Sequence, residues 1–142
     1  MILLDTNVVS EQMRLEPSSI VMKWFDEIDQ NQLYLSSVTE AELCSGIEMM
    51  PNSKAKLLKA EKAELILQSI FKDRILPFES KAAIFYAEIF SHRKNIGSPI
   101  STLDNMIAAI AKANSCKLAT RNVADFESCR LEVINPWANS VK

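Results

Sequence analysis

The chain has 142 residues, close to the usual size of one domain, and 48% of them are hydrophobic while 24% are charged. Its two glycines and five prolines exclude a collagen-like or low-complexity chain, and no apolar run approaches the roughly 20 residues of a membrane span. Residues 1–52 hold 2 basic and 9 acidic side chains and residues 53–142 hold 14 and 9, which indicates either an anionic partner at one face or merely an uneven surface.

Short apolar runs predict the strands of a sheet. Ile2–Leu4 is followed by Asp5, Thr6 and Asn7, a pattern typical of a buried strand that leads into a helix. Similar runs predict further strands at 33–35, 75–78 and 117–120, and a short edge strand at 131–134.

Apolar residues at helical spacing occupy the segments between these strands. They predict helices after Asp5 and over residues 20–28, 37–49, 54–71, 80–90 and 105–114. Ser37 and Glu40 have the spacing of a capping box at the start of the third of these helices. Because strands and helices alternate, we expect an α/β fold with a parallel sheet, in a single domain over residues 1–142.

The cysteines and the single histidine exclude several kinds of site. Cys44, Cys116 and Cys129 are odd in number and lack Cys-x-x-Cys spacing, which argues against disulfides and zinc and indicates a reducing cytoplasm. His92 stands beside two cations, so a solvated helix face is a better interpretation than a catalytic base. The N-terminus has no signal-peptide features, and we expect a cytoplasmic protein without membrane contact.

Four acidic side chains lie next to the expected strands. Asp5 and Asp125 follow the first and fourth strands, Glu42 lies in the first turns of a helix, and Asp104 lies in the first turn of another. Ligands of open parallel sheets bind beyond the carboxyl ends of the strands, so the four acids converge there if these strands are neighbours. The simpler alternatives are helix capping for Asp5 and Asp104 and a solvated turn for Asp125.

Crowded carboxylates raise one another's pKa unless cations neutralise them, and Mg²⁺ or Mn²⁺ with oxygen ligands do so. A metal site of this kind activates water against a phosphodiester. The chain has no glycine-rich phosphate loop, which argues against nucleoside triphosphate binding.

Five motifs follow one another between residues 2 and 137. They are Leu3-Leu4-Asp5-Thr6-Asn7, Val38-Thr39-Glu40-Ala41-Glu42-Leu43 with Gly46-Ile47, Thr102-Leu103-Asp104-Asn105-Met106-Ile107-Ala108-Ala109, Leu118-Ala119-Thr120-Arg121-Asn122-Val123-Ala124-Asp125-Phe126, and Val133-Ile134-Asn135-Pro136-Trp137. As an ordered set they resemble the motifs of PIN-domain ribonucleases, and among these the VapC-type toxins. The resemblance implies a three-layer PIN-like fold, in which a central parallel sheet of four or five strands carries helices on both faces.

The resemblance also implies the site. Asp5, Glu42 and Asp104 correspond to the acidic metal ligands, and Thr120 and Asn122 to polar residues that orient metal-bound water. Either Asn122 or Asp125 takes the position of the fourth acid of the family, which leaves open whether one or two ions bind.

The function implied is a Mg²⁺- or Mn²⁺-dependent endoribonuclease, the toxin of a type II toxin–antitoxin pair, which is homodimeric and inhibited by a VapB-like antitoxin. The alternative is a catalytically silent RNA- or protein-binding module on the same scaffold. An aspartyl-phosphate phosphatase is set aside because Asn7 stands where its general acid is required.

Two contact surfaces are predicted. RNA phosphates require cations around an acidic pocket, and Arg121, Arg93 and Lys94 are the candidates, unless Arg93 and Lys94 only solvate a helix end. A groove for an antitoxin helix is predicted from Trp24 with Met22, Met49 and Met50, unless Trp24 and Phe25 belong to the core.

Overall fold

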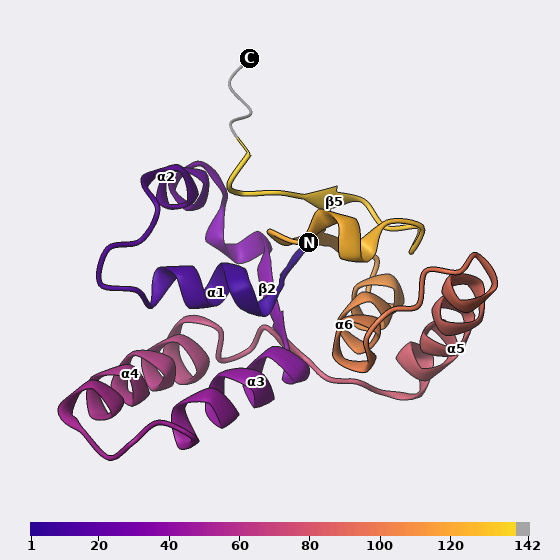
Figure 1. Cartoon of the computed structure of the whole chain (residues 1–142). Helices are drawn as coiled ribbons and strands as arrows, with labels where there is room; N and C mark the ends of the chain where they lie inside the picture. The colour runs from indigo at the N-terminus through magenta and orange to yellow at the C-terminus, as the bar shows by residue number, and fades with distance from the viewer. Residues whose placement is uncertain (139–142) are drawn as a thin grey trace.

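The computed structural model describes residues 1–138, in which a five-stranded sheet lies between two groups of helices (Figure 1). The strand order is β3-β2-β1-β4-β5, and every neighbouring pair is parallel. In that order the strands are Ile75–Leu76, Leu33–Ser36, Ile2–Leu4, Lys117–Ala119 and Val133–Ile134. The predicted α/β class and parallel sheet are confirmed, whereas the predicted domain end at residue 142 lies outside the described residues.

Six helices and three shorter helical turns connect the strands. The helices are α1 (Thr6–Gln12), α2 (Ser19–Glu27), α3 (Ser37–Glu48), α4 (Lys54–Leu65), α5 (Ser80–Asn95) and α6 (Thr102–Ala113), and the turns are η1 (Gln30–Gln32), η2 (Ile66–Ile70) and η3 (Val123–Phe126). The segment predicted as one helix over 54–71 is α4 followed by the wider π-helical turn η2. No helix among residues 1–138 has both the length and the apolarity needed to cross a membrane.

The sheet is buried on both faces, as parallel sheets usually are. Side chains alternate along β1, so Ile2 and Leu4 enter the core under α1–α4, while Leu3 enters the core under α5 and α6. Alanines of α6 lie fully buried in the second core, where their small side chains permit a close approach to the sheet. Figure 1 shows these two helical groups on opposite sides of the strands. Burial on both faces fixes the register of β1 and therefore the position of Asp5 at its end.

Two local predictions are wrong. Ser36, and not Ser37, caps α3, because β2 runs to Ser36 and its Oγ accepts the N–H of Thr39 at 3.0 Å. The predicted groove is also absent from residues 1–138, since Met49 follows the end of α3 that lies far from α2 (Figure 1). Trp24 instead packs against the first core, and its ring contacts that of Phe25 edge to face, with 5.1 Å between the ring centroids.

Candidate active site

A cleft of about 520 Å³ lies beyond the carboxyl ends of the central strands. It is lined by acidic, polar and basic side chains together with one tryptophan: Asp5, Thr6, Asn7, Ser10, Glu11, Arg14, Glu42, Lys59, Asp104, Arg121, Asn122 and Trp137. The structure therefore brings Asp5, Glu42 and Asp104 into one cleft, although they lie on β1–α1, α3 and α6. This follows from the strand order, because β1 lies between β2, which leads into α3, and β4, which follows α6.

Asp5 is the most buried acid of the cleft, with 4% of its surface exposed. Its Oδ1 accepts the N–H of Thr6 at 2.8 Å, and its Oδ2 accepts Thr120 Oγ1 at 2.7 Å and Asn7 Nδ2 at 3.3 Å. Burial raises the pKa of Asp5, and the charges of Asp104 and Glu42 raise it further against the opposing hydrogen bonds of Thr120 and Thr6. A cation bound here would relieve this electrostatic cost.

Glu42 is held by a series of hydroxyl groups. Thr6 Oγ1 donates to Glu42 Oε1 at 2.6 Å and lies 3.0 Å from Thr39 Oγ1. Because the single hydroxyl proton of Thr6 is directed to Glu42, Thr39 must donate to Thr6. The carboxylate of Glu42 is thereby fixed toward the start of α1, beside Asp5. Sequence reasoning assigned no role to Thr6, which was noted only as part of a motif.

Asp104 lies in the first turn of α6, where Ser101 caps the helix and accepts the N–H of Asp104 at 3.2 Å. Burial raises the pKa of Asp104 although a hydrogen bond between its side chain and Ser101 opposes the shift, and the charge of Asp125 raises it further, while that of Arg93 lowers it. Asp125 is exposed in η3 and is not among the residues that line the cleft. The predicted convergence of four acids is therefore wrong for Asp125, whose charge reaches the site only by raising the pKa of Asp104.

Thr120 and Asn122 extend the network around Asp5. Thr120 is fully buried, and its Oγ1 donates to Asp5 and accepts the N–H of Asn122 at 3.0 Å. Asn122 itself lines the cleft. The turn after β4 thus supplies the buried bond that orients Asp5 and one polar group at the surface of the cleft.

Cations lie in the same cleft as the acids. Arg121 is joined there by Arg14 and Lys59, neither of which belongs to a motif that sequence reasoning had singled out. Arg14 is paired with Glu11 at 3.3 Å, and Glu11, 5% exposed, also accepts the N–H of Ser18 at 2.7 Å. This backbone bond and the pairing with Arg14 lower the pKa of Glu11.

The interpretation of Arg93 is corrected by the structure. Arg93 is 4% exposed, and its guanidinium donates to the carbonyl oxygens of Ser98 at 2.6 Å and Asp125 at 2.8 Å and to Cys129 Sγ at 3.3 Å. A side chain buried in this way ties loops together, so its prediction as an RNA contact is wrong. Lys94 is exposed outside the cleft lining, 6.0 Å from the Phe90 ring, and its RNA contact stays a prediction.

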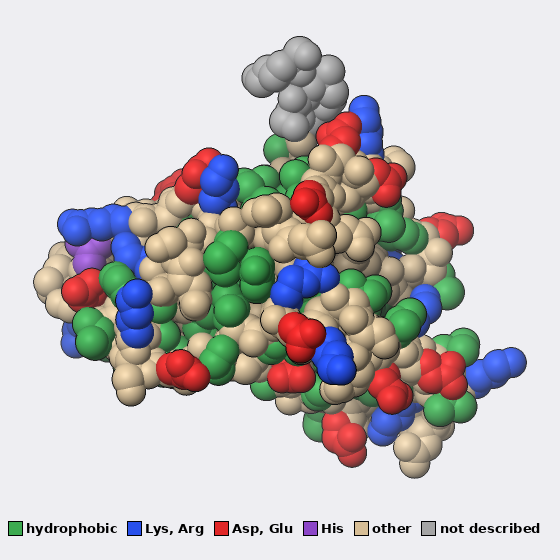
Figure 2. Space-filling view, turned by 180° about the vertical axis from the view of Figure 1, so that it is seen from behind, with side chains coloured by type: hydrophobic (Ala, Val, Ile, Leu, Met, Phe, Trp, Pro, Cys, Tyr) green, Lys and Arg blue, Asp and Glu red, His purple; other side chains and the backbone are tan. Residues whose placement is uncertain are grey.

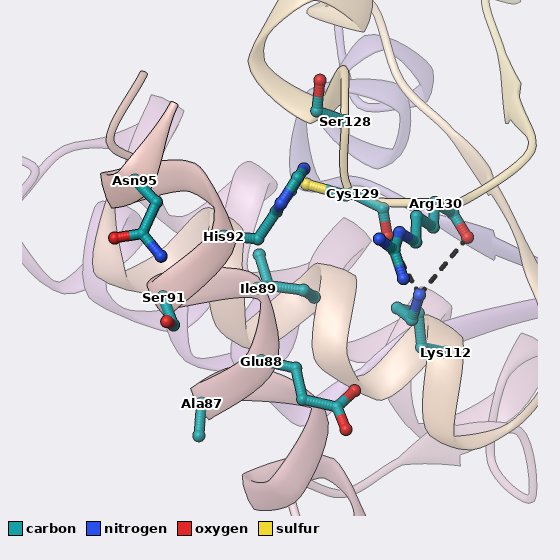
Figure 3. Close-up of a pocket in the computed structure, with 10 residues that line it drawn as sticks. All are labelled: Ala87, Glu88, Ile89, Ser91, His92, Asn95, Lys112, Ser128, Cys129 and Arg130. Carbon is teal, nitrogen blue, oxygen red and sulfur yellow. Dashed lines mark hydrogen bonds between the residues drawn. The ribbon is translucent and has the colours of Figure 1, made fainter. Parts of the chain in front are cut away.

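A second cavity, of about 620 Å³, lies between α5, α6 and the loop after η3. It contains His92, which Figure 2 shows in purple among lysine and arginine side chains at one end of the molecule. Lys112 lies in this cavity and donates to the carbonyl oxygens of Cys129 at 3.1 Å and Arg130 at 3.4 Å (Figure 3). Glu88 is its one acidic lining residue, so this cavity lacks the group of carboxylates that the sequence predicted.

The cleft is suited to a hard divalent cation by its donor atoms rather than by a preformed cage. Among residues 1–138, no three His, Cys, Asp or Glu side chains lie close enough to hold a metal ion. Mg²⁺ retains several waters and is commonly bound through one or two carboxylates, so the oxygen donors of Asp5, Glu42 and Asp104 still fit it.

Comparison with known proteins agrees with this geometry. The model of the PIN domain family matches residues 2–128. The chain is 42% identical to toxin FitB of Neisseria gonorrhoeae, over 96% of this chain and 99% of FitB, and 39% identical to VapC ribonuclease Y4jK of Sinorhizobium fredii, over 96% and 98%. The solved structure of FitAB bound to an IR36 DNA fragment is similar with a TM-score of 0.91 and 40% identity, covering 97% of this chain and 96% of that one.

Proposed function

Because this chain belongs to the PIN-domain family, we propose that it is a metal-dependent endoribonuclease and the toxin of a toxin–antitoxin pair. Relatives named as a toxin and as a ribonuclease, each aligned over almost their whole length, support the assignment. The observation that carries it is the buried Asp5 carboxylate, which shares one cleft with Glu42 and Asp104.

Mg²⁺ or Mn²⁺ would bind among the carboxylates of Asp5, Glu42 and Asp104, directly to one or two of them and through its retained water to the rest. When bound, such an ion polarises the phosphodiester and lowers the pKa of its water. The chain itself orients the ligands, since Thr120 and Asn7 hold Asp5 and Thr6 holds Glu42.

The remaining groups act on the substrate and on the charge of the site. Asn122 offers a polar group to water in the cleft, and the charge of Asp125, outside the cleft lining, raises the pKa of Asp104. Arg121 supplies a cation for RNA phosphates, which an acidic pocket alone would repel.

The test is cleavage of RNA by an Asp5→Asn variant. We expect cleavage to be abolished, because the substitution removes the charge at the centre of the donor set while keeping the shape of the side chain. Glu40→Gln is the matched control, since Glu40 lies on α3 close to Glu42 in sequence but does not line the cleft. Full cleavage by Asp5→Asn would contradict the proposed role of Asp5, whereas absence of cleavage by the wild type would favour a silent binding module.

Metal dependence has its own measurement. We expect cleavage to stop in EDTA and to return with Mg²⁺ or Mn²⁺, and we expect Mg²⁺ to raise the unfolding temperature of the wild type but not of Asp5→Asn. Cleavage that persists in EDTA would show that the reaction does not require a divalent metal ion.

We also propose a partner antitoxin and a homodimer. Toxin–antitoxin complexes among solved relatives support the antitoxin, and large apolar side chains remain exposed for protein contacts on α4 (Leu57, Leu58, Leu65) and on α5 (Ile84, Phe90). Co-expression with the product of an adjacent small gene is expected to give a tight complex without ribonuclease activity. A strictly monomeric chain that no co-expressed product inhibits would contradict both parts.

A further inference from the structure

We propose that the indole ring of Trp137 is a stacking platform for one base of a single-stranded RNA, beside the acids of the cleft. This inference rests on the proposed function and names which part of the RNA the cleft holds in addition to phosphate. A flat aromatic surface in a cationic cleft is the feature that binds unpaired nucleotides without a fixed sequence.

Trp137 is anchored on one part of its surface and open on another. It follows β5 in a turn, in which its N–H is held by Asn135 Oδ1 at 3.0 Å. The side chain is half-buried against the first core and also lines the cleft of Asp5. Because the core packing fixes the ring, little freedom is lost when a base stacks on it.

Arg121 at present covers this ring. Its guanidinium carbon lies 5.0 Å from the ring centroid, and it has no carboxylate partner among residues 1–138. At an exposed site a cation–π contact is weak, whereas a phosphate offers arginine two charge-assisted hydrogen bonds. An RNA phosphate that draws Arg121 away therefore exposes the ring face to a base of the same strand.

Arg121, which covers the ring of Trp137, is connected to the acidic centre through a hydrogen bond of its backbone to Asn7. The N–H of Arg121 donates to Asn7 Oδ1 at 3.3 Å, and Asn7 Nδ2 donates to Asp5 Oδ2 at 3.3 Å. A base stacked on Trp137 would therefore lie in the same cleft as Asp5. Lys59, which lines the same cleft, is available to a flanking phosphate, whereas Arg14 is paired there with Glu11.

The first experiment measures stacking directly, by fluorescence. The chain has two tryptophans, so Trp24→Phe leaves Trp137 as the only one, and Trp24 lies outside the cleft lining. The variant is titrated in EDTA with a single-stranded oligoribonucleotide and with an abasic strand of equal length. We expect the RNA to quench the emission of Trp137 strongly, and the abasic strand, which can only draw Arg121 from the ring, to change it far less. Equal quenching by both strands, or by neither, would overturn the proposal.

The second experiment measures affinity for the same two strands in EDTA. Trp137→Leu is expected to weaken binding of the RNA by about 5- to 150-fold, the usual loss when a base-stacking aromatic is removed. Its affinity for the abasic strand stays unchanged, Trp137→Phe retains most of the affinity for RNA, and Trp24→Leu is the matched control. Arg121→Ala is expected to weaken the binding of both strands alike, because it removes a phosphate contact.

Three results would reject the platform. They are an unchanged RNA affinity in Trp137→Leu, an equal loss for both strands, and a loss confined to binding of an antitoxin, which would make Trp137 a protein contact. Neither experiment depends on cleavage. A wild type that does not cleave RNA would reject the proposed function while the fluorescence result stands, and a cleaving enzyme without quenching would reject only the platform.

Discussion

Asp5 and Asp104 are the residues whose charge the folded chain opposes most clearly. Burial raises the pKa of both carboxyls, so the folded state binds these protons more tightly than the unfolded chain does. For a group with a raised pKa, stability increases as the pH falls through the folded value, and the increase is complete below the unfolded value. Metal binding requires the opposite, charged form.

We therefore predict that stability in EDTA depends on pH through Asp5. Relative to Asp5→Asn, the wild type is expected to gain stability as the pH is lowered from neutral toward the ordinary carboxyl range. At neutral pH, saturating Mg²⁺ should raise the stability of the wild type and leave the stability of Asp5→Asn unchanged. Thermal unfolding of both proteins across this range, with EDTA or Mg²⁺, measures the effect. A constant difference between them at all pH values would contradict it.

Thr6 gives a second prediction at this scale. Thr6→Val removes the hydroxyl that donates to Glu42 at 2.6 Å while keeping the volume of the side chain. We expect kcat to fall by about 10- to 100-fold, the value of one hydrogen bond to a charged group, and Thr6→Ser to retain activity. Steady-state kinetics at saturating RNA and thermal unfolding separate this loss from misfolding. Wild-type kcat in Thr6→Val would exclude an orienting role.

Single residues differ in how well the sequence predicts them. Asp5 was expected near the cleft because it directly follows a buried strand, and that position depends on local order alone. Arg14 and Lys59 enter the cleft only through the packing of α1 and α4, which no spacing in the sequence expresses. Arg93 was misinterpreted because backbone carbonyls, invisible to a side-chain pattern, satisfy its charge.

The secondary structure elements offer a test of the cap of α3. Ser36→Ala is expected to destabilise the protein by about 1 kcal/mol or more, since its buried Oγ accepts the N–H of Thr39. Ser37→Ala is the matched control and is expected to be nearly neutral, because Ser37 is already the first residue of the helix. Urea unfolding measures the free energy of unfolding of both variants. A larger loss in Ser37→Ala than in Ser36→Ala would identify Ser37 as the cap, as the sequence predicted.

The sequence predicts the type and the order of the strands and helices, but not the residues at which they end. All five predicted strands are present, because a run of buried apolar residues between turn residues is a local signal. β3 is shorter than predicted: it pairs with β2 only through Ile75 and Leu76, and Pro77 has no N–H to continue the ladder. Element ends therefore depend on which residues find a partner in space.

For the whole molecule, charge distribution matters more than the net charge of −2. We predict that Arg121→Ala lowers RNA affinity and reduces the slope of log affinity against log salt by about one. The control is Lys23→Ala, which is expected to change neither quantity, because Lys23 is exposed on α2 outside the cleft lining. Filter binding at several salt concentrations measures both. An unchanged slope in Arg121→Ala would place the phosphate contacts elsewhere.

The two outermost strands, β3 and β5, have two residues each. A sheet usually recruits foreign chains at its edge, where a long row of free N–H and C=O groups templates another strand. Here an incoming strand would find only a two-residue ladder on either side, so fibril-like stacking and domain exchange through the sheet are disfavoured. A protein partner is therefore expected to recognise the side chains of this chain rather than to pair with the backbone of its sheet.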